Sequence, residues 1–243
     1  MTLLTTELSL PPPFSLVTLR EVGDAFAHAR QIAGEQGAGT LVYVGRFDLA
    51  EFAVVLEPEE PLRSARRAFY AGMVALSDAL TAFAPPETPM DTVWPDTVRV
   101  NLGLVGGGRL GWPEDADESE VPDWLVFGAM VRMVSLGDEP GVTPLSTALE
   151  EEGFADINSG RLMESFARNF MTVNDLWQER GFDAVAKEYL QRLPGERGVQ
   201  RSIDVNGDLL IKRMEKTGIE RKALLPALAQ PSWLDPQEGG PKR

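Results

Sequence analysis

The stretch from Thr92 to Leu110 holds most of the residues in this chain whose types and spacing could do chemistry. It reads TVWPDTVRVNLGLVGGGRL, with a Trp-Pro-Asp triplet and three consecutive glycines before an arginine. Arginine binds carboxylates and phosphates through charge-assisted hydrogen bonds, and glycine leaves room beside the backbone. These residue types suit a site for a small anionic molecule. The candidate ligand-binding residues are Arg46, Trp94, Pro95, Asp96, Asn101, Gly106, Gly107, Gly108 and Arg109.

Each of these residues also has an ordinary structural explanation. Trp94 and Pro95 can pack and turn the chain where a strand begins, as apolar aromatic residues usually do. The run from Gly106 to Gly108 can form a hairpin or a bulge without any ligand. Arg46 and Arg109 can be paired with the chain's abundant carboxylates. On the residues alone, both explanations stay open.

Composition excludes several kinds of function. The 243 residues include no cysteine and one histidine, which rules out disulfides, cysteine nucleophiles and multi-histidine zinc sites. A formal net charge of -14 makes nucleic acid a poor partner, because phosphate backbones are bound by clustered lysine and arginine. The sequence has neither a run of about 18 apolar residues nor a secretory leader. We therefore expect a cytoplasmic protein that does not span a membrane.

The acidic loop PEDADESE, residues 113–120, is the segment that could suggest a metal. Carboxylates are the ligands that calcium prefers. The loop lacks the glycine and the terminal glutamate spacing of an EF-hand, and a solvated connection between strands explains it as well. We therefore predict no metal site.

Apolar periodicity predicts the elements that position the candidate residues. Helices are expected over residues 22–33, 62–83, 162–177 and 182–189, with Gly34 and Gly37 ending the first and Gly181 separating the last two. Strands are expected over residues 40–44, 52–56, 93–101, 109–112 and 124–134, with a loop over residues 45–51. This pattern predicts an α/β (α+β) fold, with a mixed sheet and flanking helices.

The C-terminal part is expected to form a small separate domain. In SIDVNGDLLIKR, Asn206 and Gly207 separate two strand-like runs and should supply the positive φ angles of a tight hairpin turn. Residues 231–243 are polar and rich in proline and glycine, so we expect them to be frayed. The predicted organisation is a first domain over residues 1–192 and a small domain, with a β-hairpin and a flexible tail, over residues 193–243.

The order of these pieces resembles the biotin and lipoate protein ligases. That family has a mixed α/β, class II synthetase-like catalytic domain, in which a Lys-Trp-Pro-Asn-Asp segment precedes a strand, a second lysine and a glycine-rich turn. Here residues 93–97 read Val-Trp-Pro-Asp-Thr and are followed by a strand and the three glycines. The segments GTLVYVGRF, EFAVVLEP and DWLVFGAMVRM resemble the family's core strands, and the resemblance spans residues 16–213.

The resemblance implies a two-step reaction. ATP, with Mg²⁺, activates the carboxylate of biotin or lipoate as an acyl-adenylate, and a lysine of a biotinyl or lipoyl carrier domain then attacks it. Both steps need cations on the carboxylate and the α-phosphate, and losing one preorganised donor typically costs about 3 to 4 kcal/mol. Relatives often dimerise through the catalytic sheet, so the resemblance also suggests a homodimer.

The chain departs from the family where the family supplies positive charge. Val93 stands in place of the lysine before Trp-Pro, and Leu104 in place of the second lysine in the simplest ungapped alignment. The family's arginine- and glycine-rich loop shrinks to GRFDLAE, in which Arg46 is the cation. Asp96 replaces the usual asparagine and puts a carboxylate where an anionic intermediate would lie. No catalytic residue can therefore be assigned.

Two hypotheses follow. In the first, Arg46, Arg99 and Arg109 replace the lost lysines, and the chain is an active ATP-dependent ligase that attaches biotin, lipoate or a related acyl group to a carrier-protein lysine. In the second, which we favour, the scaffold persists as a degenerate or altered module that binds a small carboxylate or its adenylate. Both hypotheses place Trp94, the glycines and Arg46 around one cleft.

Overall fold

The computed structural model describes residues 8–136, 145–155 and 157–243. Within these residues, seven strands form one sheet in the order β1-β2-β3-β7-β6-β5-β4. β1 and β2 are parallel, and the other neighbouring strands are antiparallel. The bounds are β1 Ser15–Leu19, β2 Thr40–Val44, β3 Leu49–Leu56, β4 Met90–Val93, β5 Thr97–Val100, β6 Gly103–Gly111 and β7 Leu125–Arg132. The predicted mixed sheet with flanking helices is confirmed.

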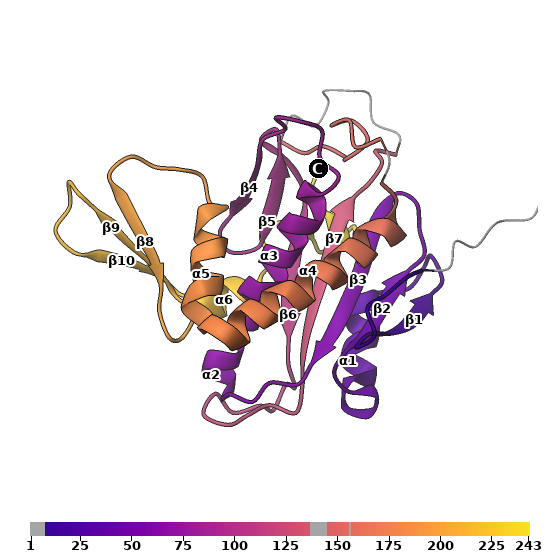
Figure 1. The fold of residues 1–243 in the computed structure, drawn as a ribbon, viewed down its shortest axis with the longest axis horizontal. Coiled ribbons are helices and arrows are strands. Elements are labelled where there is room, and N and C mark those ends of the chain that lie inside the picture. The colour runs from indigo at the N-terminus through magenta and orange to yellow at the C-terminus, as the bar shows by residue number, and fades with distance from the viewer. Residues whose placement is uncertain (1–7, 137–144, 156) are drawn as a thin grey trace, which may run out of the picture.

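Helices cover both faces of this sheet (Figure 1). α1, Ala25–Gln36, lies on one face against β2, β3 and β7. On the other face, α3, Ala68–Thr81, packs on β6 and β7, and α4, Ser159–Arg180, packs on β3 and on α3. α5, Phe182–Gln191, follows α4 and packs on α3. The two faces are therefore buried in separate apolar clusters.

Aromatic side chains hold α4 against the central strands. The ring centroid of Phe166 in α4 lies 5.7 Å from that of Phe127 in β7 and 5.5 Å from that of Phe170. Phe166 also contacts Phe52 of β3, with a centroid distance of 4.7 Å. All four side chains are buried. The apolar spacing that predicted this helix thus places its apolar stripe on the sheet.

The helix predicted over residues 62–83 is divided into two. α2, Leu62–Ala65, ends at Arg66, and α3 begins shortly after. The side chain of Arg66 is 7% exposed; it binds Glu118 at 2.8 Å and donates to the Asn206 carbonyl at 3.2 Å. Backbone carbonyls of the acidic loop accept hydrogen bonds from the first amides of α2. The apolar stripe continues across this break, so periodicity alone could not reveal it.

Three predicted boundaries in the sheet are wrong. Residues 93–101 are the end of β4, a turn over residues 94–96, and β5. The run from Gly106 to Gly108 does not form a hairpin turn, because it lies inside β6 and pairs with β7. Next to Gly106, the register of β6 against β5 shifts between Val98 and Arg99, which agrees with the bulge offered as the alternative. β3 begins at Leu49, so the loop predicted over residues 45–51 is shorter than expected.

Helix α1 also differs from its predicted bounds. Its start is fixed by Asp24, whose carboxylate accepts a hydrogen bond from the Ala27 amide at 2.9 Å. Its end is capped by Gly37, with φ at 75°, whereas Gly34 lies inside the helix. Val22, predicted on its apolar stripe, is 97% exposed. A capping carboxylate fixes the first turn more sharply than apolar spacing does.

A second sheet of three strands, in the order β10-β9-β8, lies beyond α5 (Figure 1). Its bounds are β8 Val199–Ile203, β9 Leu209–Arg213 and β10 Ile219–Lys222. The predicted hairpin is present, but its connection is longer than a two-residue turn. Gly207 has φ at 87°, whereas Asn206 does not have a positive φ. The Asp204 carboxylate accepts hydrogen bonds from the amides of Asn206 and Asp208, each at 2.9 Å, and thereby shapes the longer turn.

The C-terminal segment, which we define as residues 231–243, is the largest departure from expectation. It follows α6, Leu224–Ala229, and folds back on the large sheet. β11, Leu234–Asp235, pairs with β12, Gly240–Pro241, and β12 contacts β6 and β7. Trp233 is fully buried. The prediction of a frayed tail is wrong, because burial of one large indole outweighs the polar composition around it. The predicted division at residue 192 remains a prediction.

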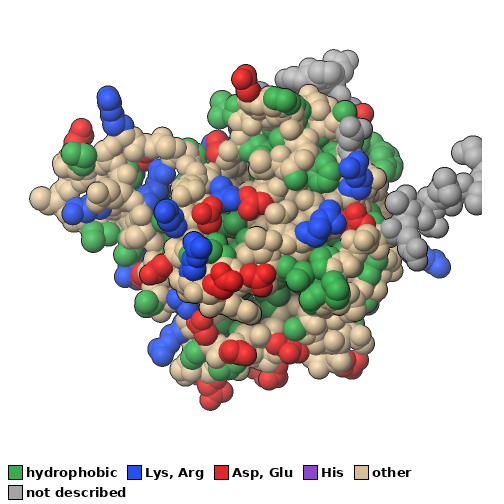
Figure 2. Space-filling view, viewed as in Figure 1, with side chains coloured by type: hydrophobic (Ala, Val, Ile, Leu, Met, Phe, Trp, Pro, Cys, Tyr) green, Lys and Arg blue, Asp and Glu red, His purple; other side chains and the backbone are tan. Residues whose placement is uncertain are grey.

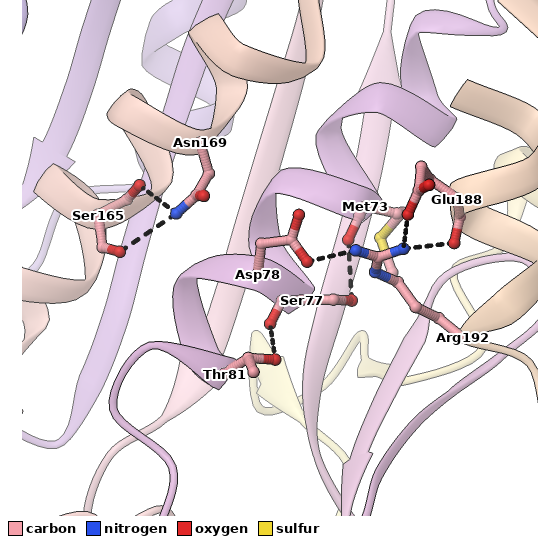
Figure 3. A network of polar contacts seen from close by, with 8 residues as sticks. All are labelled: Met73, Ser77, Asp78, Thr81, Ser165, Asn169, Glu188 and Arg192. Carbon is pink, nitrogen blue, oxygen red and sulfur yellow. Dashed lines mark hydrogen bonds and ion pairs between the residues drawn. The ribbon is translucent and has the colours of Figure 1, made fainter. Parts of the chain in front are cut away.

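Arg192 ties the end of α5 to α3 (Figure 3), and its backbone ties α5 to the sheet. Its guanidinium binds Asp78 of α3 and Glu188 of α5. Its carbonyl accepts a hydrogen bond from the Thr92 amide in β4 at 2.8 Å. The strand that precedes Trp94 is thereby fixed to both helices.

Charge is unevenly distributed on the surface. Figure 2 shows acidic side chains along the middle and lower part of one face, and several lysine and arginine side chains near the small sheet. In the part of the chain that the structure describes, none of the helices combines the length and the apolar character needed to cross a membrane.

Phe166→Ala should lower the free energy of unfolding by about 3 to 5 kcal/mol, because it leaves a cavity among buried rings. Denaturant unfolding followed by circular dichroism measures this loss. Phe47 is 67% exposed and provides the control; Phe47→Ala should change the free energy of unfolding by less than about 0.5 kcal/mol. Equal losses in the two variants would contradict the packing described for α4.

Candidate functional site

The turn between β4 and β5 directs Trp94 and Pro95 toward the helices. Trp94 Nε1 donates a hydrogen bond to the Tyr70 hydroxyl of α3 at 3.1 Å. The Tyr189 hydroxyl of α5 donates to the Pro95 carbonyl at 2.6 Å. Both residues therefore take part in packing and turning the chain, which is the structural explanation offered for them.

The two tyrosines continue this contact toward the small sheet. The ring centroids of Tyr70 and Tyr189 lie 4.5 Å apart, and the Tyr70 hydroxyl donates to the Gly207 carbonyl at 2.6 Å. Burial raises the pKa of both hydroxyls, so both stay protonated and act as donors. Trp94 thus belongs to a chain of hydrogen bonds between the large sheet and the hairpin of the small sheet.

Asp96 instead binds the C-terminal segment. Its carboxylate is buried and accepts hydrogen bonds from the Ser232 amide at 2.7 Å and from the Ser232 hydroxyl. The Thr97 hydroxyl also contacts the Ser232 hydroxyl, at 2.7 Å. Burial raises the pKa of Asp96, and the hydrogen bonds from Ser232 oppose this rise. The carboxylate is therefore already bound by groups of its own chain.

Strand β6 presents glycine to both faces of the sheet. A Cβ atom on Gly108 would lie 2.6 Å from the Met73 sulfur, on the α3 side. A Cβ atom on Gly107 would lie 2.4 Å from Trp233 Cδ1, on the side of the C-terminal segment. Trp233 Nε1 donates to the Gly108 carbonyl at 2.9 Å. The glycines thus permit close approach of the core on one face and of an indole on the other.

A charged cluster, formed by Asp24, Glu51 and Arg109, lies where α1 begins. Arg109 binds Asp24 at 3.0 Å, and its guanidinium lies 4.2 Å from the centroid of the Phe26 ring. Glu51 is buried and accepts a hydrogen bond from the Ala25 amide at 2.8 Å. Burial raises the pKa of Glu51 and lowers that of Arg109. The Nε atom of Arg109 is buried and has no hydrogen-bond partner among the described residues.

Arg46 lies apart from the glycines. Its guanidinium makes two hydrogen bonds to the Asp48 carboxylate, at 2.9 and 2.6 Å. This pairing raises the pKa of Arg46 and lowers that of Asp48. Arg46 lines a cavity of about 140 Å³ together with Leu49, Arg132 and the C-terminal segment. Neither Trp94 nor the three glycines line that cavity.

The remaining candidates in this stretch have backbone roles. Asn101 lies in the turn between β5 and β6, has φ at 47°, and binds Glu152 through its side-chain amide. Gly106 lies against the backbone of β7, where a Cβ atom would meet the Met130 carbonyl oxygen at 1.9 Å. Neither position brings a side chain toward Trp94 or Arg46.

Val93 and Leu104, which are predicted to stand in place of the family's lysines, lie in different surroundings. Val93, at the end of β4, is 38% exposed. Leu104 is partly buried against a small apolar cluster that includes Trp233. Arg99, offered as a replacement cation, binds Asp91 at 2.8 Å.

The structure therefore brings some predicted residues together and separates others. Asp96 binds Ser232 and Gly107 lies against Trp233, so both meet the start of the C-terminal segment, whereas Trp94 faces α3 and Arg46 lines a separate small cavity. Their roles in ligand binding stay predictions. Sequence reasoning missed Trp233, and the signal was a large aromatic residue in an otherwise polar tail. It also missed Glu51, a single carboxylate in an apolar strand-like run.

Two further features of the described chain were considered as possible ligand or metal sites, a cavity and the acidic loop. A cavity of about 520 Å³ lies between the end of β3, α2 and α4, and contains none of the predicted site residues. Within the described ranges, no group of three or more histidine, aspartate or glutamate side chains is placed to hold a metal. In the acidic loop, Glu118 is paired with Arg66 instead.

Sequence comparison places most of the chain in one family. The model of the biotin/lipoate A/B protein ligase family matches residues 10–191. No curated protein matches the chain.

Solved structures show the same fold. A biotin protein ligase-like protein of unknown function from Silicibacter sp. TM1040 is 30% identical, with a TM-score of 0.78 over 92% of this chain and 100% of that chain. Biotin protein ligase from Aquifex aeolicus is 16% identical, with a TM-score of 0.65 over 86% of this chain and 95% of that chain. The same enzyme in complex with biotin and ATP is 17% identical, with a TM-score of 0.63 over 85% and 94%.

Asp96→Asn tests the burial of this carboxylate. Because folding raises the pKa of Asp96, the folded state binds this proton more tightly than the unfolded state, and the resulting stability is lost as the pH rises through the raised pKa. Asparagine does not titrate, so the variant should gain stability relative to the parent protein as the pH is raised from about 4. Urea denaturation at a series of pH values measures the difference.

Asp48→Asn provides a control of opposite sign. Its pKa is lowered in the folded state, so its contribution to stability is present at higher pH and is lost as the pH falls. The relative stability of this variant should therefore decrease as the pH rises, with the change confined to values below about pH 5. A difference for Asp96→Asn that does not vary with pH would show that the carboxylate is not buried as described.

Proposed function

Because the chain belongs to the biotin/lipoate A/B protein ligase family, we propose that it is a ligase-like protein with lost or altered catalysis that binds a small carboxylate or its adenylate. One observation carries this proposal. Each of the three arginines that could replace the family's lysines is paired with a carboxylate of the same chain. The pairs are Arg46 with Asp48, Arg99 with Asp91, and Arg109 with Asp24.

Paired arginines offer little to an anionic intermediate. A cation assists acyl-adenylate chemistry when it is already directed at the developing negative charge, and loss of one such donor lowers the rate by about 100- to 1,000-fold. The two hydrogen bonds from Arg46 to Asp48 would have to be exchanged for the intermediate. Asp96 adds a buried carboxyl group rather than a cation. These contacts support a site that binds more readily than it catalyses.

The surroundings of the two replaced lysines support the same conclusion. Val93 and Leu104 carry no charge, and Leu104 packs against the apolar cluster of Leu49, Met130 and Trp233. A lysine in that cluster would lose much of its hydration, which is unfavourable for the charged form. Position 104 thus has no cation, and its surroundings are too apolar to stabilise a charged lysine.

The second candidate is an active ligase, and one observation favours it. Nε of Arg109 is buried and, in the described part of the chain, has no hydrogen-bond partner, so this guanidinium retains a donor. In that case ATP with Mg²⁺ and biotin or lipoate would be substrates, and a biotinyl or lipoyl carrier domain would be the acceptor. Under either candidate we propose a cytoplasmic protein, able to form a homodimer, whose partner is a small carboxylate and not nucleic acid.

Incubation with ATP, Mg²⁺ and biotin, lipoate or octanoate should release no pyrophosphate above background, because the required cations are missing or paired. Calorimetric titration should detect binding of at least one of these acids. The Aquifex aeolicus biotin protein ligase assayed with biotin serves as the positive control. Rapid pyrophosphate release would overturn the loss of catalysis. Absence of binding by all three acids, both in the parent protein and in a Trp233→Ala variant, would overturn the proposed ligand class.

Placing lysine at Val93 and Leu104 tests whether the missing positive charge alone accounts for the proposed loss of catalysis. The double variant Val93→Lys, Leu104→Lys should keep its fold by circular dichroism, yet release pyrophosphate at the background rate, because Asp96 and the paired arginines remain. The double variant Val93→Met, Leu104→Met is the neutral control of similar length. A gain of more than about tenfold in the lysine variant alone would contradict this expectation, since one charged contact can supply that much.

A further inference from the structure

We infer that the C-terminal segment covers the sheet face that carries Gly107, and that Trp233 blocks the access of small molecules to this face. The closure stands on the contacts of the segment itself. The identity of the excluded ligand rests on the proposed function, since it assumes that a small carboxylate is what this face would bind.

Trp233 occupies a slot made by the central strands. We define the slot by Leu49 of β3, Gly107 of β6 and Met130 of β7. The indole is fully buried there, and its Nε1 donates to the Gly108 carbonyl at 2.9 Å. A Cβ atom at Gly107 would overlap with the Asp96 carbonyl oxygen, at 1.9 Å, and with the ring, so both the neighbouring backbone and the slot need glycine here. Its shape and its acceptor suit a planar apolar ring that carries one N–H donor.

One buried indole and a set of hydrogen bonds hold the segment on the sheet. Ser232 donates twice to Asp96, and Trp233 Nε1 donates to the Gly108 carbonyl. Arg132 of β7 donates to the Pro241 carbonyl at 2.6 Å. Trp233 and Pro241 are the buried residues of the segment, and the others are partly or fully exposed. A segment with so few buried anchors can detach without unfolding the domain.

Detachment would change the chemistry of this face. Asp96 would lose the hydrogen bonds from Ser232, and the slot would be open to solvent. The cavity beside Arg46 would also open, because Glu238, Gly240 and Pro241 of the segment form part of its wall. An acid with an apolar ring or chain could then place its apolar part in the slot. Trp233 therefore determines which ligands can reach the face.

A thiol reporter tests the closure directly, because the chain contains no cysteine. Met130→Cys places a single thiol under the indole, where the parent side chain is 3% exposed. In otherwise parent protein, this thiol should react slowly with Ellman's reagent. Adding Trp233→Ala should accelerate the reaction at least about tenfold, and millimolar indole should slow it again by refilling the slot.

Matched controls separate opening of the slot from unfolding. Ala71→Cys places a thiol on the buried α3 side, and its reactivity should not change with Trp233→Ala. Gln237→Ala alters an exposed residue of the segment and should leave the Met130→Cys thiol slow. If Trp233→Ala also exposes the α3-side thiol, Trp233→Phe replaces it; this variant keeps a ring but loses the N–H donor, and should accelerate only the Met130→Cys thiol. The inference would be overturned if the Met130→Cys thiol reacted equally fast with Trp233 and with Trp233→Ala. It would also be overturned if added indole did not slow the reaction in the Trp233→Ala variant.

Calorimetry with biotin, lipoate and octanoate then tests the link to the proposed function. Binding to Trp233→Ala should be at least about tenfold tighter than to the parent protein, because the parent spends most of its time closed. Equal affinities would overturn competition between Trp233 and the ligand. If neither protein binds any of the acids but the thiol reporter responds as expected, the proposed ligand class is wrong and the closure stands.

Discussion

Aromatic rings lie directly against the central strands on both faces of the sheet, and glycine makes this approach possible. On the outer face, Phe26 of α1 lies over Gly128, where a Cβ atom would come within 2.6 Å of the ring. Beside it, Trp233 lies over Gly107 in the same way. On the inner face, Gly108 makes room for core side chains of α3. The missing side chains set the separation of the layers. They thereby set how closely α1 and the C-terminal segment approach the sheet.

Electrostatics on the outer face follow from this geometry. The charged cluster brings Arg109 between the carboxylates of Asp24 and Glu51, and the amide of Ala25 satisfies one oxygen of Glu51. Asp96 is satisfied by Ser232. Buried charged groups are costly unless paired or hydrogen-bonded, and here the chain supplies most of the partners itself. A ligand that needed these groups would have to displace contacts already made.

Local patterns in the sequence were sufficient for much of the fold. Apolar spacing identified α4, α5 and β2, because each of these elements buries one continuous set of side chains. The order of the elements was sufficient for the family. The glycine run was not interpretable locally, since three glycines permit a turn as well as a strand, and only pairing with β7 decides between them. The direction of Trp94 was equally hidden, because its partner Tyr70 lies on a distant helix. Trp233 finds its acceptor 125 residues away, beyond the reach of any local pattern.

The leucine at position 104 and the buried indole of Trp233 suit each other on this face. Leu104 belongs to the apolar surroundings of Trp233, together with Leu49 and Met130. A lysine at this position would put an ammonium group where hydration is poor, so closing the segment over it would be unfavourable. With leucine, the same closure buries apolar surface and is favourable at roughly 25 cal/mol for each Å². Under the proposed function, the leucine that stands in place of a family lysine therefore also allows the C-terminal segment to cover this face. A face that binds an anionic ligand and an apolar slot filled by Trp233 favour different residues at position 104, and leucine suits only the slot.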